Sequence, residues 1–231
     1  MNPLVIGFTR LLEKHRSGTL AYWAFDRLST ALSRLGLAIQ ITMIYRESEG
    51  EGAKPQPRLA DVVCGVSTAA ELSELAGIRS DTSSYEEFVE RVRQGAQCYY
   101  MRHEDRIIGY TWCEIHGSPR PRFGLAFGPT DAYVYDAYTI PAYRGLNLLP
   151  FLRYHVLQDL KRRGCDVVLS STDIFNRPAH RFKQKLGAQP IVIRLYVKLF
   201  GWFERVFTLY QFRALPLSVQ AALEIATTSS S

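Results

Sequence analysis

Two spacings of apolar residues alternate along the chain, and segments rich in Gly, Pro and charge separate them. A spacing of three to four residues predicts helices, and it occurs at residues 3–35, 68–75, 84–94, 148–163 and 176–186. Alternating or β-branched runs predict strands, and they occur at residues 37–45, 59–66, 97–102, 106–116, 133–140, 166–170, 191–200 and 203–212. This order of strands and helices predicts a mixed sheet in an α/β (α+β) chain.

Two segments admit a second interpretation. Residues 3–35 form a basic amphipathic pattern with Trp and Phe, which would suit a cap on the core, a dimer contact or a membrane surface. Residues 195–209 also fit one amphipathic helix on an anionic membrane, although two strands around Gly201 are favoured. Ser67 or Thr68 is expected to cap one helix, with Thr68-x-x-Glu71 forming a capping-box pattern, and Ser84 is expected to start the next.

The segment from Tyr133 to Gly164 predicts a strand, a tight turn and a helix, and the turn is suited to a phosphate. Amides at a helix N-terminus are unpaired and carry partial positive charge, and a small residue lets a phosphate approach them. Gly145 supplies such a position, and Asn147 tolerates the left-handed conformation. Arg144 adds a fixed positive charge. We therefore expect a pyrophosphate over residues 144–149.

The run Pro141-Ala-Tyr-Arg-Gly-Leu-Asn-Leu-Leu resembles the acyl-CoA-binding turn of the GNAT acetyltransferase superfamily, usually Arg/Gln-x-x-Gly-x-Gly/Ala after a strand and a proline. Arg144 matches the first position. Asn147 occupies a position where the motif has a glycine, and Leu149 occupies the position where it has a small residue. This resemblance implies a GNAT-like acyltransferase domain.

A second block, Asn176-Arg-Pro-Ala-His-Arg-Phe-Lys-Gln-Lys-Leu-Gly-Ala, is similar to a later block of the family, in which an Asn opens a short helix ending in Leu-Gly-Phe. Asn176, Ala179, Leu186 and Gly187 match it. Lys183 stands where many members carry a tyrosine acid, and Ala188 replaces the Phe. The two blocks occur in the family's order and cover roughly the second half of its conserved domain.

The resemblance also implies which residues act. Acyl-CoA is expected to bind through Ala137, Tyr138, Thr139, Arg144, Gly145, Leu146, Asn147, Leu148, Leu149, Asn176 and Lys183. The catalytic base of the family is usually a carboxylate on or near the strand before the turn, so Asp136 is the first candidate and Glu114 the second. The alternative for Asp136 is a structural ion pair with an arginine.

More than one residue could act as the acid that protonates the leaving thiolate. Tyr138, Tyr143 and His180 are candidates, and the reaction can also proceed without an acid. In a pleated strand Asp136 and Tyr138 share one face, and either face could meet the substrate. On the following helix, Arg153, Lys161, Arg162 and Arg163 are expected to be solvated, with Arg153 nearest to a cofactor phosphate.

Length and composition narrow the class of protein. The 231 residues, 47% of them apolar, suffice for one sizeable core. We predict a helical extension with its linker at residues 1–58, the acyltransferase domain at residues 59–215 and a tail at residues 216–231. The four cysteines are scattered, so no metal site or disulfide frame is expected. The sequence has no signal-peptide pattern and no spanning apolar run, which predicts a cytoplasmic protein, with peripheral membrane contact left open.

A net charge of +6 favours an anionic partner, although no basic run interleaved with aromatics indicates nucleic acid. We predict an acyl-CoA-dependent N-acyltransferase, with acetyl-CoA as the first donor and a primary amine of an amino sugar or amino acid as acceptor. One alternative is a longer acyl chain, delivered by CoA or an acidic carrier protein. Another is a catalytically idle module that binds a membrane or a protein. A homodimer is compatible with each.

Overall fold

The computed structural model describes residues 36–47, 54–79, 84–115, 127–200 and 203–212. These residues form one eight-stranded sheet in the order β2-β3-β4-β5-β6-β1-β7-β8. The strands are β1 (Leu37–Arg46), β2 (Val62–Val66), β3 (Gln97–His103), β4 (Arg106–Ile115), β5 (Asp131–Thr139), β6 (Val167–Asp173), β7 (Gln189–Leu199) and β8 (Phe203–Gln211). The helices are α3 (Ala69–Ile78), α4 (Tyr85–Arg93), α5 (Leu148–Arg162) and α6 (Arg177–Lys185), with a short 3₁₀ turn, η2 (Pro141–Tyr143).

The predicted helix starts are confirmed where a side chain caps the first turn. The Thr68 hydroxyl accepts from the Ala70 amide, and the Glu71 carboxylate accepts from the Thr68 amide at 2.8 Å, so the capping box is closed. The Ser84 hydroxyl accepts from the Glu87 amide at 3.2 Å at the start of α4. These bonds satisfy amides that would otherwise lack partners.

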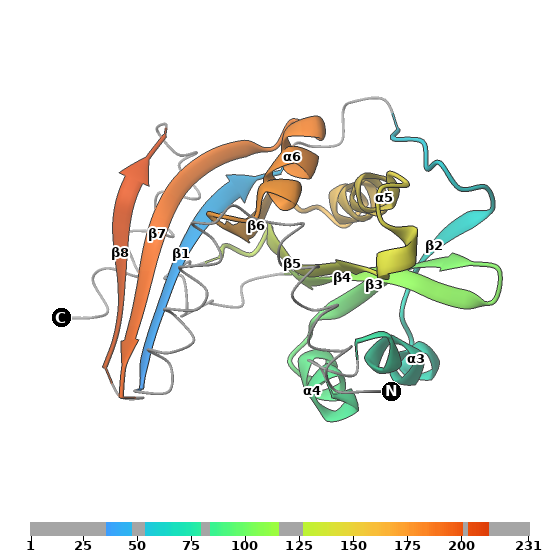
Figure 1. The fold of residues 1–231 in the computed structure, drawn as a ribbon, viewed down its shortest axis with the longest axis horizontal. Coiled ribbons are helices and arrows are strands. Elements are labelled where there is room, and N and C mark those ends of the chain that lie inside the picture. Colours follow the sequence, from blue (N-terminus) through green and yellow to red (C-terminus); the bar gives the residue numbers. More distant parts are fainter. Residues whose placement is uncertain (1–35, 48–53, 80–83, 116–126, 201–202, 213–231) are drawn as a thin grey trace, which may run out of the picture.

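Helices cover both faces of the half of the sheet formed by β2 to β5 (Figure 1). Helices α3 and α4 pack on one face around Leu75, Phe88 and Trp112, all of them fully buried. Helix α5 packs on the other face through Leu152, Val156 and the rest of its apolar side. The strand β5 therefore lies between two cores, one under each set of helices.

The N-terminal strand is part of the same sheet, because β1 lies between β6 and β7 and is antiparallel to both. The boundary expected at residue 58 therefore does not separate β1 from the acyltransferase domain. The helix predicted at residues 3–35 lies outside the described residues. No helix among the described residues is long and apolar enough to cross a membrane.

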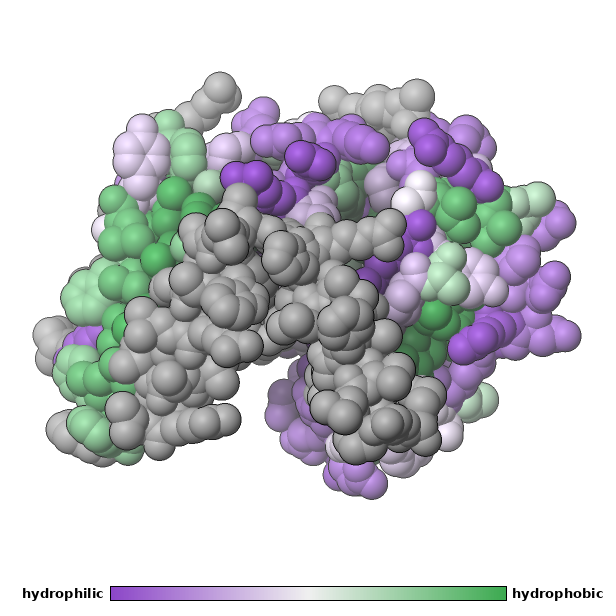
Figure 2. Space-filling view, in the orientation of Figure 1, coloured by the Kyte–Doolittle hydropathy of each residue, from purple (hydrophilic) through white to green (hydrophobic). Residues whose placement is uncertain are grey.

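The strands predicted at residues 191–200 and 203–212 correspond to β7 and β8, which pair with each other from Val192↔Gln211 to Leu199↔Phe203. The alternative of one helix at residues 195–209 is wrong. The two strands carry apolar residues on their visible face (Figure 2). On β8, Phe207, Leu209 and Tyr210 are exposed. The apolar pattern of this segment fits both a helix and a strand, and pairing with neighbouring strands selects the strand.

Candidate active site

Strands β5 and β6 are parallel neighbours only over their first residues. Their ladder runs from Asp131↔Val167 to Val134↔Ser170. Beyond these pairs β6 continues beside β1 to Asp173, while β5 continues beside β4 to Thr139. Residues 136–139, the distal segment of β5, thus have no ladder partner on β6. Where the edge of a strand has no neighbouring strand, its backbone N–H and C=O groups can bind an extended ligand through hydrogen bonds.

The turn after this segment leads into α5 and contains two residues with positive φ. Gly145 has φ +85° and Asn147 has φ +60°, so Asn147 takes the left-handed conformation expected of it. Within the described chain, none of the amides of residues 145–149 donates a backbone hydrogen bond. A Cβ placed on Gly145 would meet no atom within 4 Å. Successive amides of this kind, at the N-terminus of α5, form an anion-binding concavity.

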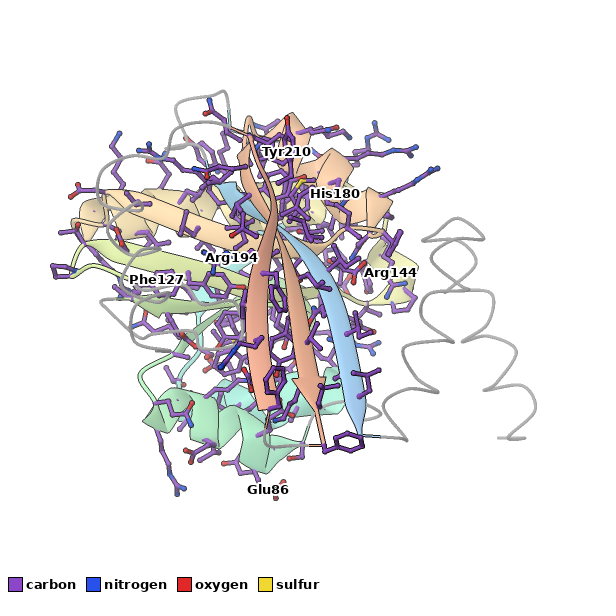
Figure 3. The ribbon with its side chains drawn as sticks, turned by 90° about the vertical axis from the view of Figure 1, so that its left-hand side faces the viewer. Glu86, Phe127, Arg144, His180, Arg194 and Tyr210 are labelled. Carbon is purple, nitrogen blue, oxygen red and sulfur yellow. The ribbon has the colours of Figure 1, made fainter. Side chains whose placement is uncertain are left out.

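Two contacts from residues 54–58 hold this turn in place. The Asn147 side-chain amide donates to the carbonyl of Gln56 at 2.8 Å, and the Arg58 amide donates to the carbonyl of Leu146 at 2.8 Å. The Arg144 Nε donates to the carbonyl of Thr139 at 3.1 Å, which joins the turn to the end of β5. Arg144 lies on the side of the molecule opposite Phe127 (Figure 3). The residues expected to bind acyl-CoA at 137–139 and 144–149 are therefore adjacent.

The other two residues expected to contact the cofactor have partners of their own. The side chain of Asn176 accepts from the Ala179 amide at 3.2 Å and caps α6. Lys183 is 2% exposed, and its Nζ donates to the hydroxyl of Ser170. Cofactor contact by these two side chains stays a prediction.

The carboxylate of Asp136 binds two arginine side chains. Its Oδ1 accepts from Arg79 Nη1 at 3.0 Å, and its Oδ2 accepts from Arg91 Nη1 at 2.6 Å. This geometry is the structural ion pair that the sequence left open for Asp136. The second carboxylate, Glu114, lies opposite Tyr133 in the ladder of β4 and β5.

The alternation of a regular strand would place Tyr135 and Tyr138 on opposite faces of β5, and this prediction is wrong. Ladder pairs Trp112↔Tyr135 and Tyr110↔Tyr138 enclose one more residue on β5 than on β4, which is a β-bulge. The extra residue resets the alternation, so Tyr135 and Tyr138 both pack against the core under α3 and α4. A strict period of two placed them on opposite faces.

Arg91 was not among the residues expected in the site, because the apolar residues of α4, Phe88, Val89 and Val92, suggest an inner face that leaves it out. Val92 is 42% exposed, whereas Arg91 packs its guanidinium over the ring of Trp112 at 5.2 Å. The spacing of three residues from the buried Phe88 would have placed Arg91 on the inner face.

A second cluster of charges is fully buried between α5, α6, β1 and β6. Glu47 accepts from Ser170 at 2.5 Å and lies 3.6 Å from both Lys183 Nζ and Arg153 Nη1. Arg153 is 3% exposed, so the expectation of a solvated, phosphate-facing side chain is wrong for this residue. The other three basic residues that were grouped with Arg153 are exposed as predicted, namely Lys161, Arg162 and Arg163.

The charge of this cluster depends on Lys183. Burial would raise the pKa of Glu47, but Arg153, Lys183 and Ser170 together hold it below its ordinary value. Burial lowers the pKa of Lys183 to about 7, with Glu47 opposing the shift and Arg153 adding to it. With Lys183 neutral, one carboxylate faces one guanidinium and the buried cluster carries no net charge.

This shift predicts a pH dependence of stability. The unfolded chain binds a proton on Lys183 up to its ordinary pKa of 10.5, while the folded chain loses it near 7. The free energy of unfolding should therefore rise between about pH 7 and pH 10 and gain nothing from this group below that window. Urea titrations of wild type and Lys183→Met across this range measure it, with the exposed Lys185→Met on the same helix as control. A rise of equal size in Lys183→Met would contradict the assignment.

Comparison with known proteins places these features in a family. The sequence model described as the acetyltransferase (GNAT) family matches residues 68–188, more than half of the chain. The chain therefore belongs to the GNAT acetyltransferase family, whose members are enzymes that use acetyl-CoA. The resemblance drawn from the two sequence blocks is thereby confirmed. Among curated proteins no match was found.

Solved structures share the fold at low identity. A GNAT-family acetyltransferase from Novosphingobium aromaticivorans is 18% identical with a TM-score of 0.51, and the match covers 71% of this chain and 66% of that one. A tandem GNAT protein from the clavulanic acid biosynthesis pathway is 16% identical with a TM-score of 0.52, covering 71% and 54%. The glucosamine N-acetyltransferase region of a fungal multi-domain enzyme is 14% identical with a TM-score of 0.52, covering 73% and 22%. The chain thus spans slightly less than two thirds of the first protein.

Proposed function

We propose that the chain transfers an acyl group from acyl-CoA to the primary amine of a small molecule, with acetyl-CoA as donor. The observation that carries this proposal is the adjacency of the distal segment of β5 and the amide-lined turn at residues 145–149. An extended pantetheine arm would hydrogen-bond along residues 136–139. The pyrophosphate would then lie over the turn, at the positive end of the dipole of α5.

The proposed reaction is direct. The amine nitrogen forms a bond to the thioester carbonyl carbon, the carbon–sulfur bond breaks, and the proton lost by the amine passes to a base while the thiolate takes up a proton. Backbone amides at the distal segment of β5 would stabilise the oxyanion that develops. Both oxygens of Asp136 are occupied by arginines. We therefore place Glu114, acting directly or through water, ahead of Asp136 as the candidate base.

Calorimetric titration with acetyl-CoA tests the donor, and we expect one saturable site. Initial rates with acetyl-, hexanoyl- and palmitoyl-CoA then test the chain length, with preference for acetyl expected. The amine panel would include glucosamine, because one structural neighbour is described as acting on it, together with amino acids. A strong preference for palmitoyl-CoA would favour the long-chain alternative. Absence of binding to every acyl-CoA would remove the proposal.

A further inference from the structure

We propose that Asp136 is a positioning residue, which fixes the bulge of β5 through its ion pairs with Arg79 and Arg91 and so aims the distal segment of β5 at the donor. This role rests on the proposed function. It differs from the role of catalytic base expected of Asp136, because the carboxylate would act through the backbone rather than on a proton of the substrate.

The bulge is a strained point of the strand. Asp136 has φ +47°, a conformation that costs a non-glycine residue free energy and persists only where surrounding contacts enforce it. It lies directly after Tyr135, where the ladder with β4 shifts by one residue. The bulge also begins two residues past Val134, the last residue paired with β6. The backbone beyond it is therefore oriented by contacts other than the β6 ladder.

The contacts of Asp136 come from both helices on that face. Arg79 follows the end of α3 and Arg91 lies in the last turn of α4, and each binds a different oxygen of the carboxylate. The three side chains are only 19% to 33% exposed, which strengthens the ion pairs relative to exposed ones. One carboxylate thus joins a strained strand residue to two helices.

Aromatic rings on either side of the bulge hold the arginines in place. The guanidinium of Arg91 lies 5.2 Å from the ring centre of Trp112 and 5.7 Å from that of Tyr135. That of Arg79 lies 5.2 Å from the ring centre of Tyr138. Tyr135 precedes the bulge and Tyr138 follows it. The same arginines that bind Asp136 therefore also fix the rings that bracket it.

Substitution of the arginines separates positioning from base catalysis, because a guanidinium is not a general base. We expect Arg79→Gln/Arg91→Gln and Asp136→Ala each to lower kcat about 10- to 100-fold, the loss typical of a misplaced reacting group. The acidic limb of the pH–kcat profile should persist in Asp136→Ala. Asp136→Asn, which tolerates a left-handed backbone and keeps an acceptor oxygen, should recover part of kcat. Arginine variants with kcat within twofold of wild type, or loss of the acidic limb in Asp136→Ala, would overturn the proposal.

A second measurement does not need activity. Hydrogen exchange of the peptide covering residues 131–139 should be faster in Arg79→Gln/Arg91→Gln than in wild type. The matched control is Arg102→Gln, which removes an ion pair of 3.0 Å to Glu74 of α3 without touching β5. Faster exchange with no acyl transfer by wild type would show that the ion pairs fix the bulge of β5 while the proposed function fails. Equal exchange in the double variant and the control would overturn the positioning role itself.

Discussion

Replacing Gly145 by glutamate is expected to weaken acetyl-CoA binding at least about 100-fold. Juxtaposed like charges at an interface cost several kcal/mol, and the new carboxylate would face the pyrophosphate above the amides of residues 145–149. The φ of +85° adds backbone strain, since a side chain at this position is disfavoured whatever the space around it. Calorimetric titration of the variant with acetyl-CoA, under conditions that give a clear wild-type isotherm, measures the loss.

The same helix supplies the control for this substitution. Gly164 follows α5 at its other end, has φ +79°, and would likewise place a Cβ in open space. Gly164→Glu therefore introduces a similar strain and the same charge, but away from the proposed phosphate site. We expect it to bind acetyl-CoA within about threefold of wild type, less than the 1.4 kcal/mol that corresponds to a factor of ten. Equal weakening by both substitutions would show that strain, and not contact with the phosphate, explains the effect.

Local signals predicted those parts of the site that depend on neighbouring residues. Gly145 and Asn147 indicated a turn with left-handed positions, and both have positive φ. Thr68 and Ser84 marked helix starts, since a cap acts over three residues. These features are set by backbone geometry within one turn. A single sequence therefore contains the information needed to place them.

Features that depend on distant pairing were not predictable in this way. The bulge at Asp136 arises where β4 and β5 change register, and its arginines come from 57 and 45 positions away. Arg153 was expected in solvent with the other basic residues of its helix, although the residues one helical turn away from it are apolar. Its partner Glu47 lies on a segment interpreted as a linker. Burial of a charge requires a partner. Where the partner lies far away in sequence, a charged side chain is assigned to the surface even when the helical period places it on the apolar face.

The largest effect on stability is expected from Glu47, whose loss would leave two basic groups buried without a carboxylate. Glu47→Gln keeps the volume of the side chain but removes the charge that faces Arg153 and Lys183 at 3.6 Å. Breaking a buried ion pair by removing one partner costs about 3–5 kcal/mol. We expect a fall of this size in the free energy of unfolding at pH 7.5, measured by urea titration.

The two partners of Glu47 should not be equivalent in the same assay. Lys183, with a pKa of about 7, is largely neutral at pH 8.5, so Lys183→Met removes little charge and leaves the pair of Glu47 with Arg153 intact. Replacing it by an apolar side chain should cost less than about 1 kcal/mol at this pH, or stabilise the protein, as apolar replacements of buried ionic groups often do. Arg153→Met instead leaves Glu47 opposite a neutral amine and should cost about as much as Glu47→Gln. A loss in Lys183→Met as large as that in Arg153→Met would mean that Lys183 is charged in the folded protein and that the cluster carries a buried net positive charge.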